Sequence, residues 1–92
     1  MTYEWSPRKA AQNRTRHGVS FEEAATVFLD PLATTYSDPD PSDDEDREIT
    51  IGSSTIRRLL FVAHVLRSER VRLISARPVT PRERRQHEQG GE

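Results

Sequence analysis

The chain has 92 residues, a net charge of −1 and no cysteine, with 33% hydrophobic and 32% charged residues. This length allows one small domain and excludes a large core, while the lack of cysteine excludes disulfides, thiol catalysis and cysteine-based zinc sites. No apolar run approaches the roughly 20 residues of a membrane span, and no signal-peptide pattern is present, so we expect a cytoplasmic protein.

The charges are segregated along the chain. Residues 30–48 hold eight acids and one base, whereas residues 49–92 hold nine bases and four acids. Thirteen of the 14 bases are arginine, with Lys9 the one lysine. Arginine presents a planar fork of donors that binds phosphate or carboxylate at two points. The pattern indicates an anionic partner, although a coding bias toward arginine would give the same composition.

The first third of the chain predicts two helices. Ser6 and Pro7 form a helix start, and Gly18 a stop, so residues 7–17 should be helical. Ser20 and Glu23 form a capping box for a second helix that Asp30 and Pro31 should end, with apolar residues along one side.

The rest of the chain predicts strands and a closing helix. Strands are expected at residues 34–36, 47–51, 56–66 and 71–77, and residues 59–66 are apolar enough for a central strand covered on both faces. A second capping box at Thr80 and Glu83 opens a helix to about residue 88. The prediction is a single α+β domain over residues 1–92 with an antiparallel sheet of about four strands, a flexible acidic loop at about 37–46 and a frayed tail at 89–92.

The closing helix gathers side chains suited to phosphodiester chemistry. Glu83, Arg84 and His87 are helical neighbours, since residues three and four apart share a surface. Cleaving RNA without a metal requires a base, an acid and cations that stabilise the phosphate. The alternative is an ordinary network of surface salt bridges, in which Glu83 pairs with His87 and Arg84 with Glu88.

The arginines of the strands are further candidates. Arg77 ends its strand beside the helix cap and is the preferred phosphate ligand. Strict alternation of side chains along this strand places Arg72 on the face opposite to that of Arg77, unless a bulge intervenes. Arg47 could be neutralised by its acidic neighbours or point across the sheet into the same site. His64, inside the apolar run, is interpreted as a core or interface histidine.

Several separated motifs resemble the BrnT family, the toxins of a prokaryotic type II toxin–antitoxin system. The similarity spans residues 5 to 88 and includes a Trp-Ser-Pro-Arg-Lys start at Trp5, the segment from Asn13 through Arg16 that continues into His-Gly-Val-Ser-Phe-Glu-Glu-Ala at His17, Val-Phe-Leu-Asp-Pro from Val27, Asp-Arg at Asp46, Ile-Gly at Ile51, Ile-Ser-Ala-Arg from Ile74 and Glu-Arg at Glu83. The resemblance implies a RelE-like ribonuclease fold, toxicity through RNA cleavage and translation arrest, and neutralisation by a ribbon-helix-helix antitoxin, BrnA.

Carried over by position, the resemblance implies functional roles at Arg16-His17-Gly18, Asp46-Arg47, Ser75-Ala76-Arg77 and Glu83-Arg84. Three positions depart from the family pattern: Arg16 stands where lysine is usual, His87 where tyrosine is usual, and Ser6 where aspartate is usual. An arginine cannot serve as a proton donor at that position, and a histidine should alter the pH profile or weaken activity.

Two hypotheses follow. In the first, the chain is a metal-independent endoribonuclease toxin without a cofactor, with Arg47, Arg77, Glu83 and His87 catalytic and Arg16, His17, Arg72 and Arg84 binding RNA. Its partners would be RNA and a BrnA-like antitoxin in a 2:2 heterotetramer, with DNA bound only through the antitoxin. In the second, it is a non-catalytic module whose arginines recognise an acidic partner or nucleic acid.

Overall fold

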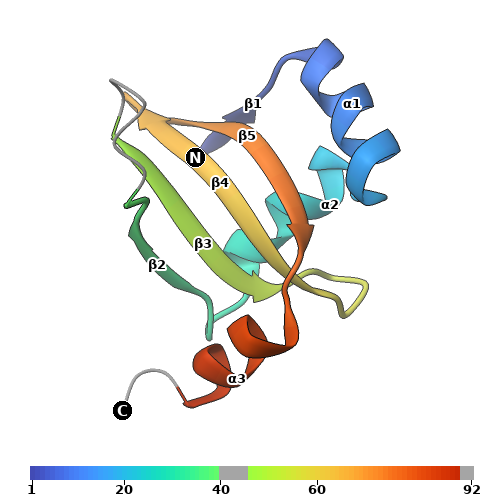
Figure 1. Ribbon diagram of the computed structural model, residues 1–92. Helices are drawn as coiled ribbons and strands as arrows, with labels where there is room; N and C mark the ends of the chain where they lie inside the picture. Colours follow the sequence, from blue (N-terminus) through green and yellow to red (C-terminus); the bar gives the residue numbers. More distant parts are fainter. Residues whose placement is uncertain (40–45, 90–92) are drawn as a thin grey trace.

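The computed structural model describes residues 1–39 and 46–89 and shows a five-stranded sheet with helices (Figure 1). The elements in chain order are β1 (Thr2–Glu4), α1 (Pro7–His17), α2 (Phe21–Thr26), the 3₁₀ turn η1 (Val27–Leu29), β2 (Thr34–Ser37), β3 (Arg47–Ser53), β4 (Leu59–Arg67), β5 (Arg70–Pro78) and α3 (Pro81–Gln89). Of the predicted acidic loop and tail, residues 40–45 and 90–92 lie outside the described residues, Ser37 belongs to β2 and Gln89 to α3.

The sheet has the strand order β1-β5-β4-β3-β2. All neighbours are antiparallel except β1, which lies parallel to β5. The α+β class is therefore confirmed and β4 is the central strand, as expected from its apolar run. The predicted sheet of about four strands lacked β1, whose three residues are too short to give a period-2 signal.

The two N-terminal helices begin at the predicted caps. The Ser6 and Ser20 hydroxyls accept hydrogen bonds from the backbone N–H groups of Lys9 and Glu23, at 3.3 and 3.0 Å. Gly18 ends α1 at φ 69°, a left-handed conformation that glycine adopts without strain. The second helical segment ends at Leu29, directly before Asp30 and Pro31 as expected, although its last turn, η1, is 3₁₀ and the α-helix itself stops at Thr26.

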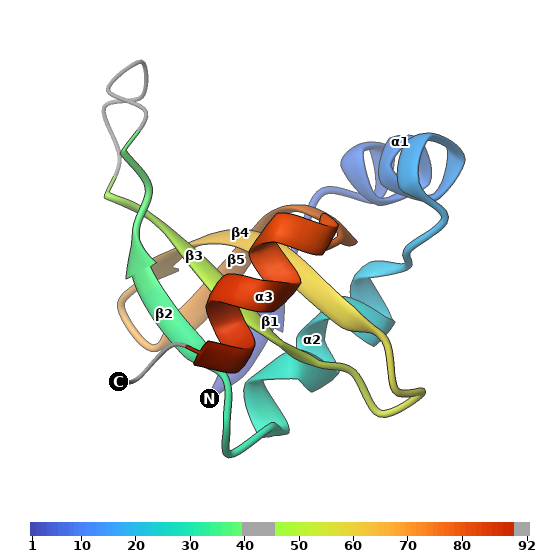
Figure 2. The same ribbon diagram turned by 60° about the horizontal axis from the view of Figure 1, so that its bottom comes forward.

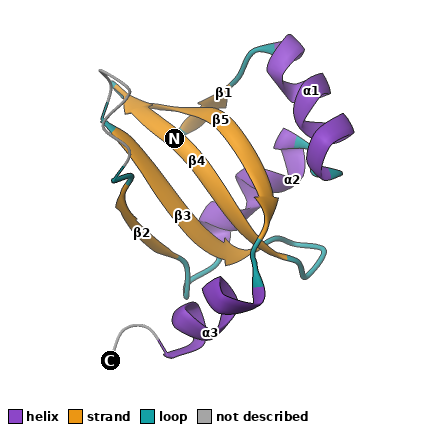
Figure 3. Ribbon diagram, viewed as in Figure 1, coloured by secondary structure: helices purple, strands orange, loops and turns teal. Residues whose placement is uncertain are grey.

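One face of the sheet is covered by α2 and the flanking helix α1. Figure 3 shows α2 behind the strands and α1 beside β5. The side chains buried between helices and sheet are those of Val19, Phe21, Ala24, Val27, Leu60, Val62, Val71, Leu73 and Ala76. Each large side chain removed from water contributes about 1.5–3 kcal/mol, so this helix-covered face holds the main core.

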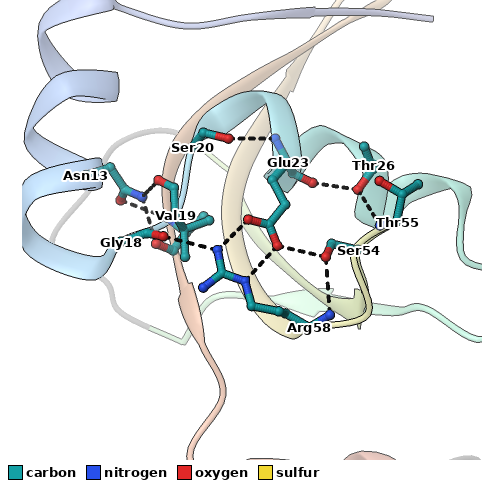
Figure 4. A network of polar contacts seen from close by, with 10 residues as sticks. Asn13, Gly18, Val19, Ser20, Glu23, Thr26, Ser54, Thr55 and Arg58 are labelled. Atoms are coloured by element: carbon teal, nitrogen blue, oxygen red, sulfur yellow. Dashed lines mark hydrogen bonds and ion pairs between the residues drawn. The ribbon is translucent and has the colours of Figure 1, made fainter.

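A polar network fastens the helices to the sheet (Figure 4). The buried Asn13 amide donates to the carbonyls of Val19 and Ala76, at 2.9 and 2.8 Å, and its oxygen accepts the Ala76 N–H at 3.0 Å. Glu23 forms an ion pair with Arg58 and accepts a hydrogen bond from the Ser54 hydroxyl at 2.8 Å. These contacts set α1 against β5 and α2 against the β3–β4 turn.

The helix α3 lies apart from this layer. Figure 2 shows it crossing in front of the strands near one end of the sheet, opposite α2. No helix within residues 1–39 and 46–89 combines the length and the apolar character needed to span a bilayer.

Candidate functional site

The sheet face on the α3 side carries the candidate site. Directly paired residues on neighbouring strands point to the same face, so the register defines three rows of side chains across β2, β3, β4 and β5. The rows are Arg47, Val65 and Arg72; Tyr36, Ile49, Ala63 and Ser75; and Thr34, Ile51, Phe61 and Arg77. We call this surface the open face, because among the described elements only α3 crosses it (Figure 2).

A β-bulge brings Arg72 and Arg77 to one face. Ala63 pairs with Ser75 but the next residue, His64, pairs with Leu73, so Ile74 is an extra residue in β5. Arg72 then lies opposite Val65 and Arg77 opposite Phe61, both on the open face. The expectation that strand parity separates these arginines is therefore wrong, because one inserted residue reverses the alternation.

Arg77 is held by Glu83 in a two-point ion pair. Its Nη1 and Nη2 atoms donate to the two Glu83 carboxylate oxygens at 2.9 and 2.8 Å, and the guanidinium lies 4.0 Å above the Phe61 ring centre. Glu83 also accepts the Thr80 N–H at 2.9 Å, which completes the predicted capping box. The contact joins α3 to β5 and fixes the guanidinium over the sheet.

The electrostatics of this pair limit what Glu83 can do. The hydrogen bonds from Arg77 lower the pKa of the Glu83 carboxyl, although desolvation opposes this, and the same hydrogen bonds raise the pKa of Arg77. Both groups therefore stay charged at neutral pH. A carboxylate in this state orients Arg77 and is a poor source or acceptor of protons.

Tyr36 is a member of the site that the sequence interpretation missed. It lies on β2 opposite Ile49 and is 44% exposed. Burial raises the pKa of its hydroxyl, and the negative charge of Glu83 adds to the effect while Arg77 opposes it. The phenol is thus neutral and close enough to the Arg77–Glu83 pair for both charges to act on it. Only the β2–β3 register reveals this placement.

His87 lies toward β2. Its Nδ1 is 3.3 Å from the Thr34 hydroxyl, and it lines a groove of about 450 Å³. The groove is formed by Asp30, Leu32, Thr34, Ser53, Leu59, Arg84, His87 and Glu88. The Arg84 and Glu88 side chains are 3.9 Å apart, as the alternative of a surface salt-bridge network predicts. Glu83, however, binds Arg77 and not His87. The closing helix therefore serves both the arginine pair and the groove.

Arg47 shares a row with Arg72, which adds positive charge to the open face. The Arg72 guanidinium also forms an ion pair with Glu4 at 3.3 Å, and both side chains are about one third exposed, at 34% and 30%. A partly exposed pair of this kind contributes little to stability. The arginine can therefore exchange its carboxylate partner for a phosphate at small cost.

Arg16 and His17 lie at the β5 edge, apart from the Arg77–Glu83 pair. They line a smaller hollow of about 180 Å³ together with Lys9, Gln12, Asn13, Ile74 and Ser75. Ser75 belongs to the open face, two residues before Arg77, so the hollow borders that face.

His64 belongs to the core, as predicted. It is 4% exposed, its Nε2 is 2.7 Å from the Thr50 hydroxyl, and its ring meets Phe28 edge-on at 5.0 Å. Desolvation lowers its pKa, which keeps the imidazole neutral at physiological pH. Across residues 1–39 and 46–89, no three histidine, aspartate or glutamate side chains converge as a metal site would require.

The fold and the candidate site together define a small α+β domain, with α1 and α2 on one sheet face and an arginine-rich surface, crossed by α3, on the other. Residues 5–83 match the family described as "Ribonuclease toxin, BrnT, of type II toxin-antitoxin system". The match covers most of the chain, and the protein belongs to this family.

The fold is similar to a solved structure. The crystal structure of the Brucella abortus ribonuclease toxin, BrnT, aligns with a TM-score of 0.65 and 21% sequence identity, over 87% of this chain and 99% of that chain. At this identity the likeness supports the fold. Comparison with curated proteins gives no significant match.

Proposed function

We propose that this protein is a metal-independent endoribonuclease, the toxin of a type II toxin–antitoxin pair, which cleaves cytoplasmic RNA and arrests translation. The observation that carries the proposal is the guanidinium of Arg77, held by Glu83 on a sheet face that also carries Arg47 and Arg72. Fixed guanidinium groups stabilise the charge that develops on a phosphate during cleavage. Family membership supports ribonuclease activity.

The residues divide into four roles. Arg77 and Arg47 bind the scissile phosphate, and Glu83 positions Arg77. His87, hydrogen-bonded to Thr34, is the imidazole available for proton transfer. The remaining RNA contacts come from Arg16, His17, Arg72 and Arg84.

The chemistry is transesterification within the RNA chain. The 2′-hydroxyl loses its proton to a base and its oxygen attacks the phosphorus, while the bond from phosphorus to the 5′-oxygen breaks and that oxygen gains a proton. The arginines stabilise the additional negative charge on the phosphate oxygens. The products are a 2′,3′-cyclic phosphate and a 5′-hydroxyl, so a metal-bound water is not needed.

The test is cleavage of total RNA by the purified protein in excess EDTA. We expect wild-type cleavage, a loss of at least about 100-fold in Arg77→Ala because a charge stabiliser is removed, and a comparable loss in His87→Ala. Arg8→Ala, exposed at the start of α1, is the matched control and should keep full activity. Full activity in both site variants would refute the site, and RNA binding without scission would favour the non-catalytic alternative.

We also propose that a BrnA-like ribbon-helix-helix antitoxin neutralises the protein in a 2:2 heterotetramer. A type II toxin requires a protein antitoxin, and family membership supports this partner. A 92-residue domain has a small core, so binding to its folded state should raise the melting temperature by mass action. An unchanged melting temperature at saturation would contradict the interaction, and the mass of the purified complex tests the stoichiometry.

A further inference from the structure

Tyr36 places an exposed aromatic ring at the edge of the open face. Its backbone pairs with Ile49, whose side chain is 2% exposed, while Tyr36 itself is 44% exposed. Covering Ile49 requires only an apolar side chain, so packing does not explain why an aromatic ring stands here. Exposed aromatic rings on a cationic sheet are the platforms on which single-stranded nucleic acids stack their bases.

The ring is also at a suitable distance from the phosphate ligand. The Arg77 guanidinium lies above Phe61 on β4, two strands away from β2, which corresponds to about 10 Å between backbones. Tyr36 sits one row from Phe61, since Tyr36 pairs with Ile49 and Phe61 with Ile51. A single nucleotide can bridge this span, with its phosphate at Arg77 and its base at the ring.

The electrostatics of Tyr36 agree with such a role. The pKa of its hydroxyl is raised, mainly by burial, so it carries no negative charge near the bound phosphate. The charges of Glu83 and Arg77 both act on the phenol, so the ring lies near the Arg77–Glu83 pair.

We infer that Tyr36 stacks on the nucleobase adjoining the phosphate that Arg77 binds, and so positions the RNA strand on the open face. The inference rests on the proposed function for the phosphate site. Stacking acts equally on the bound substrate and on the transition state, so it contributes to KM and leaves kcat unchanged.

The experiment compares Tyr36→Phe, which keeps the ring, with Tyr36→Leu, which keeps an apolar cover for Ile49. Affinity is measured by anisotropy with a labelled 2′-deoxy oligonucleotide, which the transesterification cannot cleave. Tyr36→Leu should weaken binding about 5- to 150-fold and raise KM on RNA similarly, while Tyr36→Phe stays within about twofold of wild type. Leu66→Ala, another exposed apolar side chain at 53%, is the control and should bind normally.

Oligonucleotides with one abasic position identify the stacked base. At that position the cost of Tyr36→Leu should disappear, because no base remains to stack. Normal binding by Tyr36→Leu, or equal loss in Tyr36→Phe, overturns the inference, as does a wild-type protein that binds no oligonucleotide. Tyr36-dependent binding without RNA cleavage would instead overturn the proposed function and keep the stacking site, so the two failures are distinguishable.

Discussion

The two faces of the sheet are built from the same strands but have opposite character. Nine buried apolar residues, from the strands and from the helical layer, pack together between the helix-covered face and that layer. The open face carries a smaller apolar cluster of Ile49, Ile51, Leu59 and Ala63, and around it stand arginines, a tyrosine and a carboxylate. The alternation of side chains along β3, β4 and β5 separates these two sets.

The difference teaches where stability and function reside. Removing a side chain from the helix-covered face leaves a cavity or an unsatisfied polar group, each of which is costly. Removing a charged side chain from the open face uncovers little buried surface and should change the free energy of unfolding only slightly. Four substitutions test this division, from the largest expected effect on stability to the smallest.

Phe21→Ala should have the largest effect. The side chain is fully buried and meets Trp5 edge-on at 5.9 Å. Its loss should cost about 3–5 kcal/mol, a large part of the stability of roughly 5–14 kcal/mol expected for a domain of this size. Urea unfolding measures this cost. Leu29→Ala, 73% exposed, should change stability by less than about 0.5 kcal/mol, and equal losses would contradict the division.

Asn13→Ala should follow. It removes three hydrogen bonds between α1, Val19 and Ala76 and leaves buried backbone groups without these partners, at a cost of about 2–4 kcal/mol. Thermal unfolding of this variant is compared with that of Gln12→Ala, an exposed neighbour on the same helix. If both variants have the melting temperature of the wild type, the Asn13 amide does not fasten α1 to β5.

Glu23→Gln tests the ion pair with Arg58 through pH. The hydrogen bonds from Arg58 lower the pKa of the Glu23 carboxyl from its ordinary value of 4.5. The ion pair therefore contributes fully to stability when the pH is above the ordinary carboxyl pKa of 4.5. This contribution is lost as the pH falls through the lower pKa that Glu23 has in the folded state. At pH 7 the variant should lose about 1–2 kcal/mol, and its gap to wild type should close in acid. A gap that is constant with pH would exclude this linkage.

Arg72→Gln should have the smallest effect on folding. Breaking its partly exposed pair with Glu4 should change the free energy of unfolding by less than about 1 kcal/mol. If Arg72 contacts an RNA phosphate, the slope of log K against log salt should become shallower by about 0.7. Arg8→Gln should leave that slope unchanged. An unchanged slope in Arg72→Gln would remove this arginine from the RNA surface.

Much of the fold could be predicted from local sequence. The caps at Ser6, Ser20 and Thr80 start their helices as expected, because a short polar side chain satisfies the first N–H groups wherever the chain turns into a helix. The apolar run of β4 likewise predicted a central strand and a buried His64. The β1 strand was missed, since its short segment gains its structure from pairing with β5.

The site was less predictable. The sequence indicated Arg77 and Glu83 as candidates, but helical spacing suggested a Glu83–His87 pair, whereas the structure joins Glu83 to Arg77 across two elements. Spacing along a helix shows only which residues of that helix are neighbours. It cannot show that a residue of another element, here Arg77, binds Glu83 in place of His87. The same limit hid Tyr36, which reaches the open face only through the pairing of β2 with β3.

The sequence by itself determined the types of the elements other than β1, the caps, the central strand and the supply of arginines, because these depend on interactions within a few residues. Only the tertiary structure decided which side chains share a face. One inserted residue, Ile74, puts Arg72 on the same face as Arg77, and the pairing of β2 with β3 puts Tyr36 on that face too. The physical reason is that side chains alternate with a period of two, so a single-residue change in register, invisible in composition and spacing, reassigns them to the other face.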